Sequence, residues 1–209
     1  MDGFDAVRYI LDNNIEGAIV ECGVGEGNFE SVCITELVQR NLTRDIYMFD
    51  TFGGLTVPGV NDYTSTETPF YKMTNEEVVE EWNKHVVTDK VNNWCYCSKE
   101  RVEERLNEFN YDQSKLHYVV GDVMDTLALP ANIPEKIALL RLDTDWYESS
   151  KFELQKLYGN VVSGGLIIFD DYHHWMGQKK AVDEFFTEIN HAPSLIQVDT
   201  VKTVSMIKP

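Results

Sequence analysis

Four acidic residues that follow two apolar runs are the strongest chemical signal in the sequence. They are Asp143, Asp145, Asp170 and Asp171. If the two runs are neighbouring parallel strands, these carboxylates meet at one edge of a sheet. Two like charges about 4 Å apart repel by roughly 4 kcal/mol at an effective dielectric constant of 20, so the cluster needs protons or a cation. Oxygen ligands without a nearby cysteine suit Mg²⁺, Mn²⁺ or Ca²⁺. Alternatively, one or two of the acids cap helices or pair with Arg141 or Lys179.

A glycine-rich segment, Glu21-Cys-Gly23-Val-Gly25-Glu-Gly27, lies between the first apolar run and a helical pattern. Glycines there let the backbone approach a ligand and present its N–H groups. Asp50 ends the second run, where an acid accepts both ribose hydroxyls of an adenosine-type ligand or caps the next turn. Gly121-Asp122 ends the third run, where methyltransferases place an acid near the adenine amino group. These residues predict an adenosine-sized ligand, and Asn28 in place of the third glycine of GxGxxG disfavours NAD.

The elements that position these residues can be read from the alternation of apolar runs and helical patterns. The predicted strands are Ala18 to Cys22, Ile46 to Phe49, Leu116 to Val120, Ile137 to Leu142, Gly165 to Phe169, Leu195 to Val198 and Thr203 to Ile207. The predicted helices are Ile34 to Arg40, Thr74 to His85, Glu148 to Tyr158 and Lys179 to Ile189. This alternation predicts a mostly parallel sheet with helices on both faces. The short final turn, around Thr200 to Lys202, requires the last two strands to be antiparallel. Such an α/β fold, with seven strands and an antiparallel final strand, is typical of class I (Rossmann-like) methyltransferases.

Residues 1–209 are expected to form one domain with a lid-like insertion over about residues 51–98. The insertion begins with a segment rich in glycine, proline and polar residues, and it contains a capping box formed by Thr74 and Glu77. Loops of this length in compact domains are usually lids or disordered. Its place directly after the second strand favours a lid, because ligands bind at the carboxyl ends of such strands.

Charge and composition exclude several classes of partner. The chain of 209 residues has 35 acidic against 18 basic residues, a net charge of −17, which argues against nucleic acid or an anionic membrane. With no signal peptide and no long apolar run, the expected location is the cytoplasm. Cys95 and Cys97 have the wrong spacing for a CxxC motif, and Cys22 and Cys33 are expected to be buried free thiols.

At these residues the sequence resembles the macrocin O-methyltransferase family, over nearly the whole chain. The matching stretches are Glu21 to Gly25, Phe49-Asp-Thr-Phe-Gly-Gly-Leu55 with Pro58, Leu140-Arg-Leu-Asp-Thr-Asp-Trp-Tyr-Glu-Ser149, and Gly164-Gly-Leu-Ile-Ile-Phe-Asp-Asp-Tyr172 with Trp175 and Ala181 to Phe185. The resemblance implies S-adenosylmethionine as cofactor and a sugar-like small-molecule hydroxyl as acceptor. It implies Mg²⁺ held by Asp143, Asp170 and Asp171, with Asp145 as general base. The residues assigned to the cofactor are Glu21, Gly23, Gly25, Asp50, Thr51, Asp122 and Asp143.

The sequence departs from the family at Gly25-Glu26, where relatives usually have an aromatic and a basic residue. Only about 17 residues precede the first strand. In relatives this amino-terminal arm helps to form a dimer and to cover the substrate, so a homodimer is possible and the acceptor stays open.

The implied reaction is a direct displacement on an activated methyl group, for which the protein must position the reactants and supply an oxygen nucleophile. A hydroxyl bound to Mg²⁺ becomes more acidic, and Asp145 can take its proton. His173 and His174 are further candidates for acceptor contact or for the base, although such residues are more often solvated. The aromatic residues near the cluster either line an acceptor pocket or pack in the core. They are Trp146, Tyr147, Tyr172 and Trp175.

Two other functions are compatible with parts of the sequence. A nucleotide-dependent oxidoreductase would use a Tyr-x-x-x-Lys pair, and Tyr147 and Lys151 have that spacing. A methyltransferase-like binding protein without catalysis would not need the intact set of four aspartates, so that set argues against it.

Overall fold

A seven-stranded sheet forms the centre of the protein in the computed structural model, which describes residues 3–199 and 201–209. The strand order is β3-β2-β1-β4-β5-β7-β6. The strands are β1 (Ala18–Cys22), β2 (Ile46–Asp50), β3 (Leu116–Val120), β4 (Ile137–Leu142), β5 (Val161–Phe169), β6 (Ile196–Gln197) and β7 (Val204–Ile207). The pairs among β1 to β5 are parallel, and β7 runs antiparallel to both β5 and β6. The predicted sheet, with its antiparallel final strand, is confirmed.

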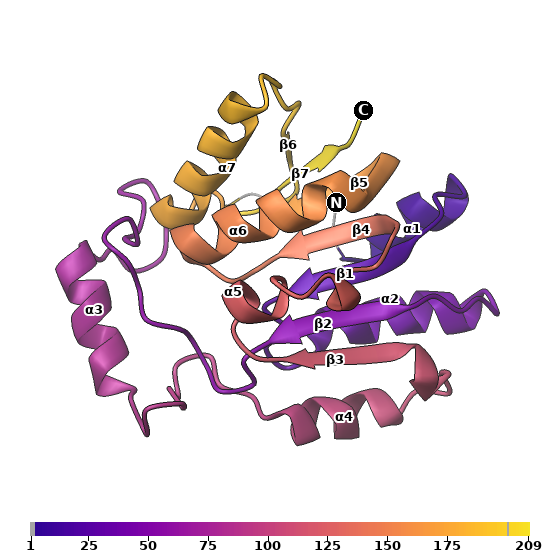
Figure 1. Cartoon of the computed structure of the whole chain (residues 1–209), viewed down its shortest axis with the longest axis horizontal. Helices are drawn as coiled ribbons and strands as arrows, with labels where there is room; N and C mark the ends of the chain where they lie inside the picture. The colour runs from indigo at the N-terminus through magenta and orange to yellow at the C-terminus, as the bar shows by residue number, and fades with distance from the viewer. Residues whose placement is uncertain (1–2, 200) are drawn as a thin grey trace.

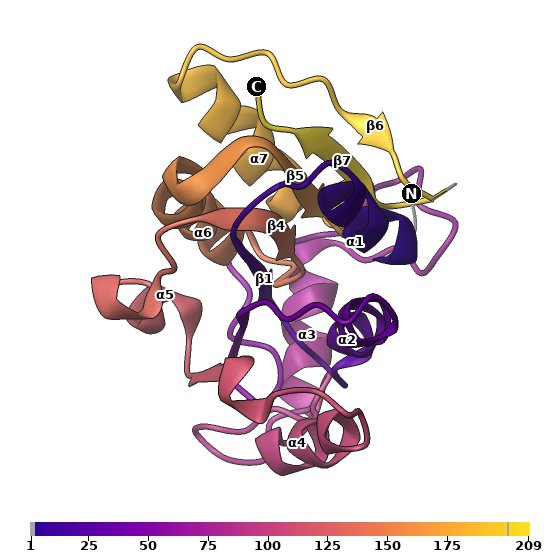
Figure 2. The same cartoon turned by 90° about the vertical axis from the view of Figure 1, so that its right-hand side faces the viewer.

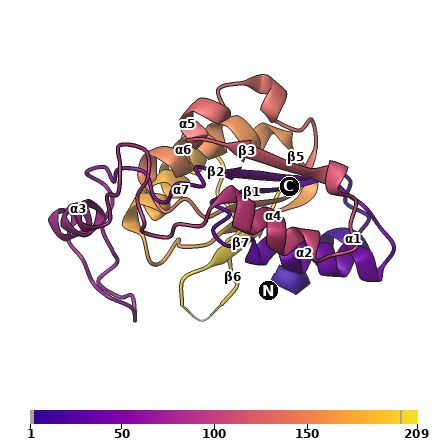
Figure 3. The same ribbon diagram turned by 90° about the horizontal axis from the view of Figure 1, so that it is seen from below.

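Helices cover both faces of the sheet, as Figure 3 shows. They are α1 (Gly3–Asp12), α2 (Asn28–Gln39), α3 (Asn75–Lys84), α4 (Lys99–Asn107), α5 (Val123–Thr126), α6 (Tyr147–Leu157) and α7 (Met176–Glu188), with short 3-10 turns at Gln113–Lys115, Pro130–Asn132 and Tyr158–Asn160. One face carries α1, α2 and α4, and the other carries α5, α6 and α7 (Figure 3). Figure 2 shows β6 and β7 at one edge of the molecule and α4 at the opposite edge.

Successive side chains of a strand point to opposite faces of the sheet and enter the half of the core on that face, as the two-residue period of a strand requires. In β1, Ile19 packs with Ile34 and Leu37 of α2, whereas Val20 belongs to the half that contains Leu154 of α6. Strands buried on both faces read as continuous apolar runs, and this is why their positions could be predicted.

Several helices differ from the prediction in where they begin. The structure starts α2 at Asn28 rather than Ile34 and α7 at Met176 rather than Lys179. Neither helix has a side-chain hydrogen bond at its N-cap, so the usual start signal is missing from the sequence. By contrast, Thr74 forms the predicted capping box at the start of α3. Helices α1, α4 and α5 were not predicted at all.

The insertion (residues 51–98) lies beside the carboxyl ends of the central strands, with α3 on its outer side (Figure 1). Its start and end are paired, because the N–H of Leu55 donates to the carbonyl of Trp94 and that of Asn92 to the carbonyl of Gly53. Thr64 forms an antiparallel bridge with Trp175. The insertion is therefore docked over the strand ends that carry the predicted site.

In the described part of the chain, no helix is long and apolar enough to cross a membrane.

Candidate active site

The glycine-rich turn follows β1 and packs tightly against the end of β4. Gly23 has a φ of 87°, and a Cβ atom there would lie 2.1 Å from the carbonyl oxygen of Asp143. Any other residue would collide with backbone, so glycine is required for the approach of the two strand ends. Gly25 has a φ of 54° and open space beside its Cα, which leaves room for a ligand.

Asp50 at the end of β2 fixes this turn. Its Oδ2 accepts hydrogen bonds from the N–H groups of Val24, at 2.7 Å, and Gly25, at 3.2 Å, while its Oδ1 accepts from the N–H of Phe52 at 2.6 Å. Burial raises the pKa of Asp50, and the three N–H donors oppose that rise. Asp50 thus caps its own turn, as one interpretation of the sequence held, and also borders the cavity described next.

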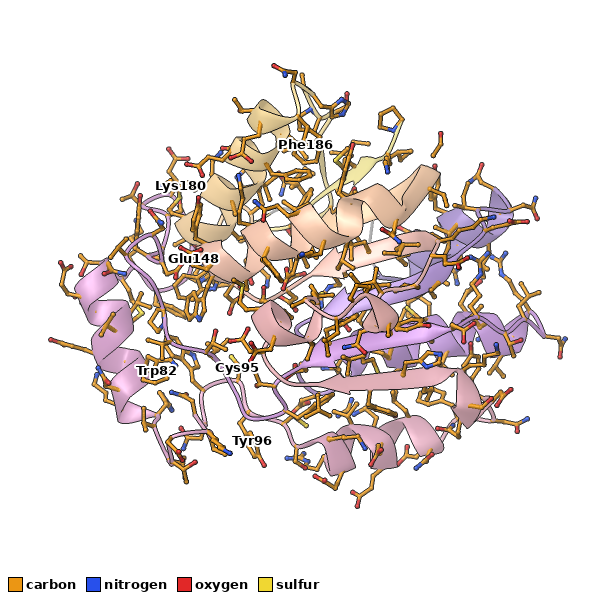
Figure 4. The ribbon with its side chains drawn as sticks, viewed as in Figure 1. Trp82, Cys95, Tyr96, Glu148, Lys180 and Phe186 are labelled. Carbon is orange, nitrogen blue, oxygen red and sulfur yellow. The ribbon has the colours of Figure 1, made fainter. Side chains whose placement is uncertain are left out.

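A cavity of about 410 Å³ lies at the carboxyl ends of the central strands. Its wall includes most of the predicted site residues, namely Gly23, Gly25, Asp50, Thr51, Asp122, Asp143, Asp145, Asp170 and Asp171. The volume falls within the roughly 300–1,000 Å³ range of small-molecule sites. Thr56 and Cys95 of the insertion contribute to the wall as well. Figure 4 shows Cys95 between α3 and the strand ends.

Glu21 and Asp122 have structural partners that differ from the predicted cofactor contacts. Glu21 is completely buried, forms an ion pair with Arg141 and is not part of the cavity wall. Burial raises its pKa well above the usual range. Asp122 borders the cavity, and its side chain accepts a hydrogen bond of 2.8 Å from the N–H of Met124 as the N-cap of α5.

The sequence predicted that four aspartates gather at this end of the sheet, and three of them form a group that could hold a metal ion. Oxygen atoms of Asp143, Asp145 and Asp171 lie within 4.8 Å of one another. Burial raises the pKa of Asp143 and of Asp145 well above its usual range, and the charge of Asp171 adds to the rise in both. Asp145 lies beyond the strand, because β4 ends at Leu142 and Asp145 has a φ of 67°. A turn brings it to the cluster instead.

The fourth aspartate, Asp170, is held by two cations. Arg141 Nη2 lies 2.7 Å from its Oδ1, and Lys202 Nζ lies 2.6 Å from its Oδ2. Although burial alone would raise the pKa of Asp170, these two charges lower it. Arg141 also pairs with Asp143, at 2.7 Å, so the alternative that the cluster pairs with Arg141 is partly realised. Lys179 pairs with Asp183 instead.

His173 and His174, which follow the aspartate pair, make different contacts. His174 is buried, its Nδ1 lies 2.9 Å from Thr68 Oγ1, and its carbonyl accepts a hydrogen bond from the N–H of Ser65. Burial lowers its pKa. The ring of His173 packs edge-on against Tyr172. His174 therefore joins the insertion to the start of α7, and neither histidine belongs to the cavity wall.

The aromatic residues near the cluster mostly pack or pair elsewhere. Trp146 and Trp175 are buried in a small apolar cluster with Val78 of α3. Tyr147 donates its hydroxyl to Glu184, and Lys151 pairs with Glu188. The Tyr-x-x-x-Lys pair of an oxidoreductase is thus engaged by carboxylates of α7.

Lys202, Cys95 and Thr144 are among the residues of the cavity wall that were not predicted from the sequence. Lys202 lies in the turn between β6 and β7, and Cys95 lies in the insertion, so no local motif marks either of them. Thr144 borders the cavity and donates to Oε1 of the buried Glu153 at 2.8 Å. Burial raises the pKa of Glu153 to about 8.

Known proteins similar to this chain are methyltransferases. A demethyldecarbamoylnovobiocin O-methyltransferase from Streptomyces niveus is 27% identical over 195 residues, covering 92% of this chain and 67% of the relative. A tetracenomycin rhamnosyl 4'-O-methyltransferase from Streptomyces olivaceus is 24% identical over 168 residues, and the match spans 79% of this chain and 57% of that relative.

The solved structure of the O-methyltransferase NovP matches 99% of this chain and 77% of its own, with a TM-score of 0.80 and 26% identity. This likeness confirms the class I methyltransferase fold. The family model described as macrocin-O-methyltransferase matches residues 2–205. The resemblance noted in the sequence is therefore confirmed, and the chain belongs to the macrocin O-methyltransferase family of enzymes.

Proposed function

We propose that the protein transfers a methyl group from S-adenosylmethionine to a hydroxyl of a sugar or glycosylated natural product, with Mg²⁺ as a cofactor. The observation that carries the proposal is that one cavity joins the Asp50-bound glycine turn to the aspartate cluster. A methyl donor bound at the glycine turn and an acceptor bound at the aspartate cluster would lie within reach of each other. One Streptomyces relative is named for 4'-O-methylation of a rhamnosyl tetracenomycin and the other for O-methylation of demethyldecarbamoylnovobiocin, and these names support this class of acceptor.

The cofactor end of the cavity fits an adenosine-type ligand. The cavity has open space beside Gly25, and the carboxylate of Asp50 can accept hydrogen bonds from the hydroxyls of a ribose placed there. Asp122 also lines the cavity. S-adenosylmethionine, when bound, supplies a methyl group that already carries a good leaving group. Thr51 Oγ1 donates to the carbonyl of Gly54 at 2.7 Å, and both residues line the cavity.

The acidic end fits a divalent cation. Carboxylate oxygens of Asp143, Asp145 and Asp171 lie within 4.8 Å of one another. Asp170 lies outside this group, and the ammonium group of Lys202 joins it to Asp171. Such oxygen donors suit Mg²⁺. We assign Asp143, Asp170 and Asp171 to the ion, which when bound would make an acceptor hydroxyl more acidic. Asp170 can bind the ion only if the ammonium group of Lys202 moves away from Asp170 Oδ2.

Asp145 is the residue that we assign to proton removal. Its carboxylate lies beside those of Asp143 and Asp171, and burial makes it a stronger base than an exposed aspartate. It would take the proton of the acceptor hydroxyl on a carboxylate oxygen as the new oxygen–methyl bond forms.

The test is methyl transfer to a panel of sugars and glycosylated natural products, with and without excess EDTA. We expect transfer from S-adenosylmethionine that EDTA abolishes and added Mg²⁺ restores. Calorimetry should show binding of S-adenosylhomocysteine and none of NAD. Tight NAD binding alone would contradict the cofactor assignment, and full activity in EDTA would contradict the metal. The cytoplasmic location and the homodimer stay predictions.

A further inference from the structure

Lys202 reaches the aspartate cluster from the turn between β6 and β7. Its Nζ lies 2.6 Å from Asp170 Oδ2 and 2.9 Å from Asp171 Oδ1. The turn that carries it is firmly built, because Asp199 Oδ1 accepts hydrogen bonds from the N–H groups of Val201, Lys202 and Thr203 at 2.8, 2.7 and 3.1 Å. The carbonyl of Lys202 also accepts a bond of 3.0 Å from the N–H of His173. The lysine backbone is therefore fixed next to the cluster.

The contacts of Lys202 overlap with the candidate cation site. Asp171 is one of the three carboxylates that lie within 4.8 Å of one another, and it is also a partner of the Lys202 ammonium. The position of Asp171 is itself fixed, since its N–H donates to Gln178 Oε1 at 2.9 Å. A divalent ion on Asp171 would therefore meet an ammonium group that lies against the same carboxylate, and the two positive charges would repel.

The two basic residues of the site differ in their freedom to move. The Arg141 side chain is 17% exposed and pairs with Glu21, Asp143 and Asp170 at once. The Lys202 side chain is 30% exposed and pairs only with Asp170 and Asp171 among the ion pairs of the described residues. Its long flexible stem can carry the charge from the carboxylates toward water. Lys202 is thus the cation that can leave.

We propose that Lys202 is a tethered competitor of the divalent ion, which neutralises Asp170 and Asp171 in the metal-free protein and withdraws when the ion binds. The inference rests on the metal requirement in the proposed function and deepens it. It explains how Asp170, whose two oxygens are both engaged, becomes available to the ion. It also implies that Lys202 weakens metal binding, because the ion must displace an existing ion pair.

The test is the Mg²⁺ affinity of Lys202→Met measured by calorimetry, with Lys202→Arg and Lys136→Met as matched controls. Lys136 lies just before β4, at the other end of the sheet, where it pairs with Glu16 on the surface. Removing the competing charge should tighten Mg²⁺ binding about tenfold or more. Lys202→Arg should bind like the wild type, and so should Lys136→Met, which controls for the change in net charge.

Thermal unfolding gives a readout that does not depend on activity. Without metal, Lys202→Met should melt at a lower temperature than the wild type, and Mg²⁺ should raise its melting temperature by more. If Lys202→Met does not fold without metal, Lys202→Gln provides the same affinity measurement. Equal or weaker Mg²⁺ binding in the variant would overturn the inference alone. If neither the wild type nor the variant binds a divalent ion, the metal requirement itself fails, and the inference with it.

Discussion

The carboxylate of Asp50 accepts a hydrogen bond of 2.7 Å from the N–H of Val24, which ties the end of β2 to the glycine turn after β1. A second bond of 3.2 Å comes from the N–H of Gly25. Asp50 therefore shapes the turn and also borders the cavity, so its removal should affect ligand binding in two ways.

Replacing Asp50 with alanine should weaken S-adenosylhomocysteine binding by about 1–3 kcal/mol, because polar groups of the turn and of the ligand lose their partner. Calorimetry measures the change. Asp45→Ala is the matched control, since Asp45 lies just before the same strand and pairs with His117 and Lys115 away from the cavity. Equal affinity of Asp50→Ala and wild type would remove Asp50 from the cofactor site.

The strands and the edge that carries the site could be predicted because their signals are local. The predicted bounds of β1, β3 and β4 match the structure, since strands buried on both faces read as continuous apolar runs. The convergence of Asp143, Asp145 and Asp171 followed from the parallel order of β4 and β5. The start of α2 could not be placed, because its N-cap, Gly27, has no side chain to cap it.

What the sequence did not reveal depends on contacts between distant segments. Lys202 and Asp170 are 32 positions apart, and their ion pair exists only because β7 returns beside β5. Cys95 borders the cavity because the insertion folds back over the strand ends, and no motif surrounds it. The pairing of Glu21 with Arg141 likewise depends on the register of β1 and β4. Local patterns therefore located the acids and missed the basic residue that comes from another element.

The docking of the insertion depends on Asp62, and the absence of a side chain at Gly177 leaves space for the Asp62 carboxylate. Asp62 is buried, with Oδ1 accepting from the N–H of Tyr147 at 2.8 Å and Oδ2 from the N–H of Gly59 at 2.6 Å. A Cβ atom on Gly177 would lie 2.0 Å from Asp62 Oδ1. The Asp62 carboxylate therefore occupies the space that a side chain at position 177 would need.

Gly177→Ala should lower the free energy of unfolding by about 2 kcal/mol, because Asp62 loses a charge-assisted hydrogen bond. Helix propensity alone would predict a gain of about 1 kcal/mol, so the sign decides between the two effects. Urea unfolding measures the change, and limited proteolysis should cut residues 51–98 faster in the variant. Gly159→Ala is the control, with nothing within 4 Å of its Cβ.

Bound S-adenosylhomocysteine should protect the insertion (residues 51–98) from proteolysis in the wild type. Equal cutting with and without S-adenosylhomocysteine would count against a lid.

Glu153 should make the stability of the protein depend on pH. Burial raises its pKa to about 8 in the folded state, above the ordinary value of 4.5. Between these values the unfolded chain releases the proton and the folded protein keeps it, so stability falls as pH rises. At about 1.4 kcal/mol per unit, the loss by pH 7 can reach about 3 kcal/mol.

Glu153→Gln keeps an acceptor for Thr144 and removes the titration. In urea unfolding experiments, the free energy of unfolding of the variant minus that of the wild type should increase steadily from pH 5 to pH 8. The measurement at pH 5 serves as the internal control, because both proteins are then uncharged at this position when folded. A difference in stability that does not change with pH would show that burial of the Glu153 charge is not the cause.

Asp145 and Asp171 have neighbouring carboxylates but different proposed roles, and two variants separate them. Asp145→Asn keeps the shape of the side chain and removes the base, so turnover should fall by roughly 10²–10⁴-fold while Mg²⁺ and S-adenosylhomocysteine still bind. Asp171→Asn removes a ligand, so Mg²⁺ affinity and turnover should fall together. Calorimetry with each of the two ligands and a methyl-transfer assay provide three measurements for each variant. If Asp145→Asn also loses Mg²⁺, its carboxylate is a ligand, as its place within 4.8 Å of Asp143 and Asp171 would allow, and another group must take the proton.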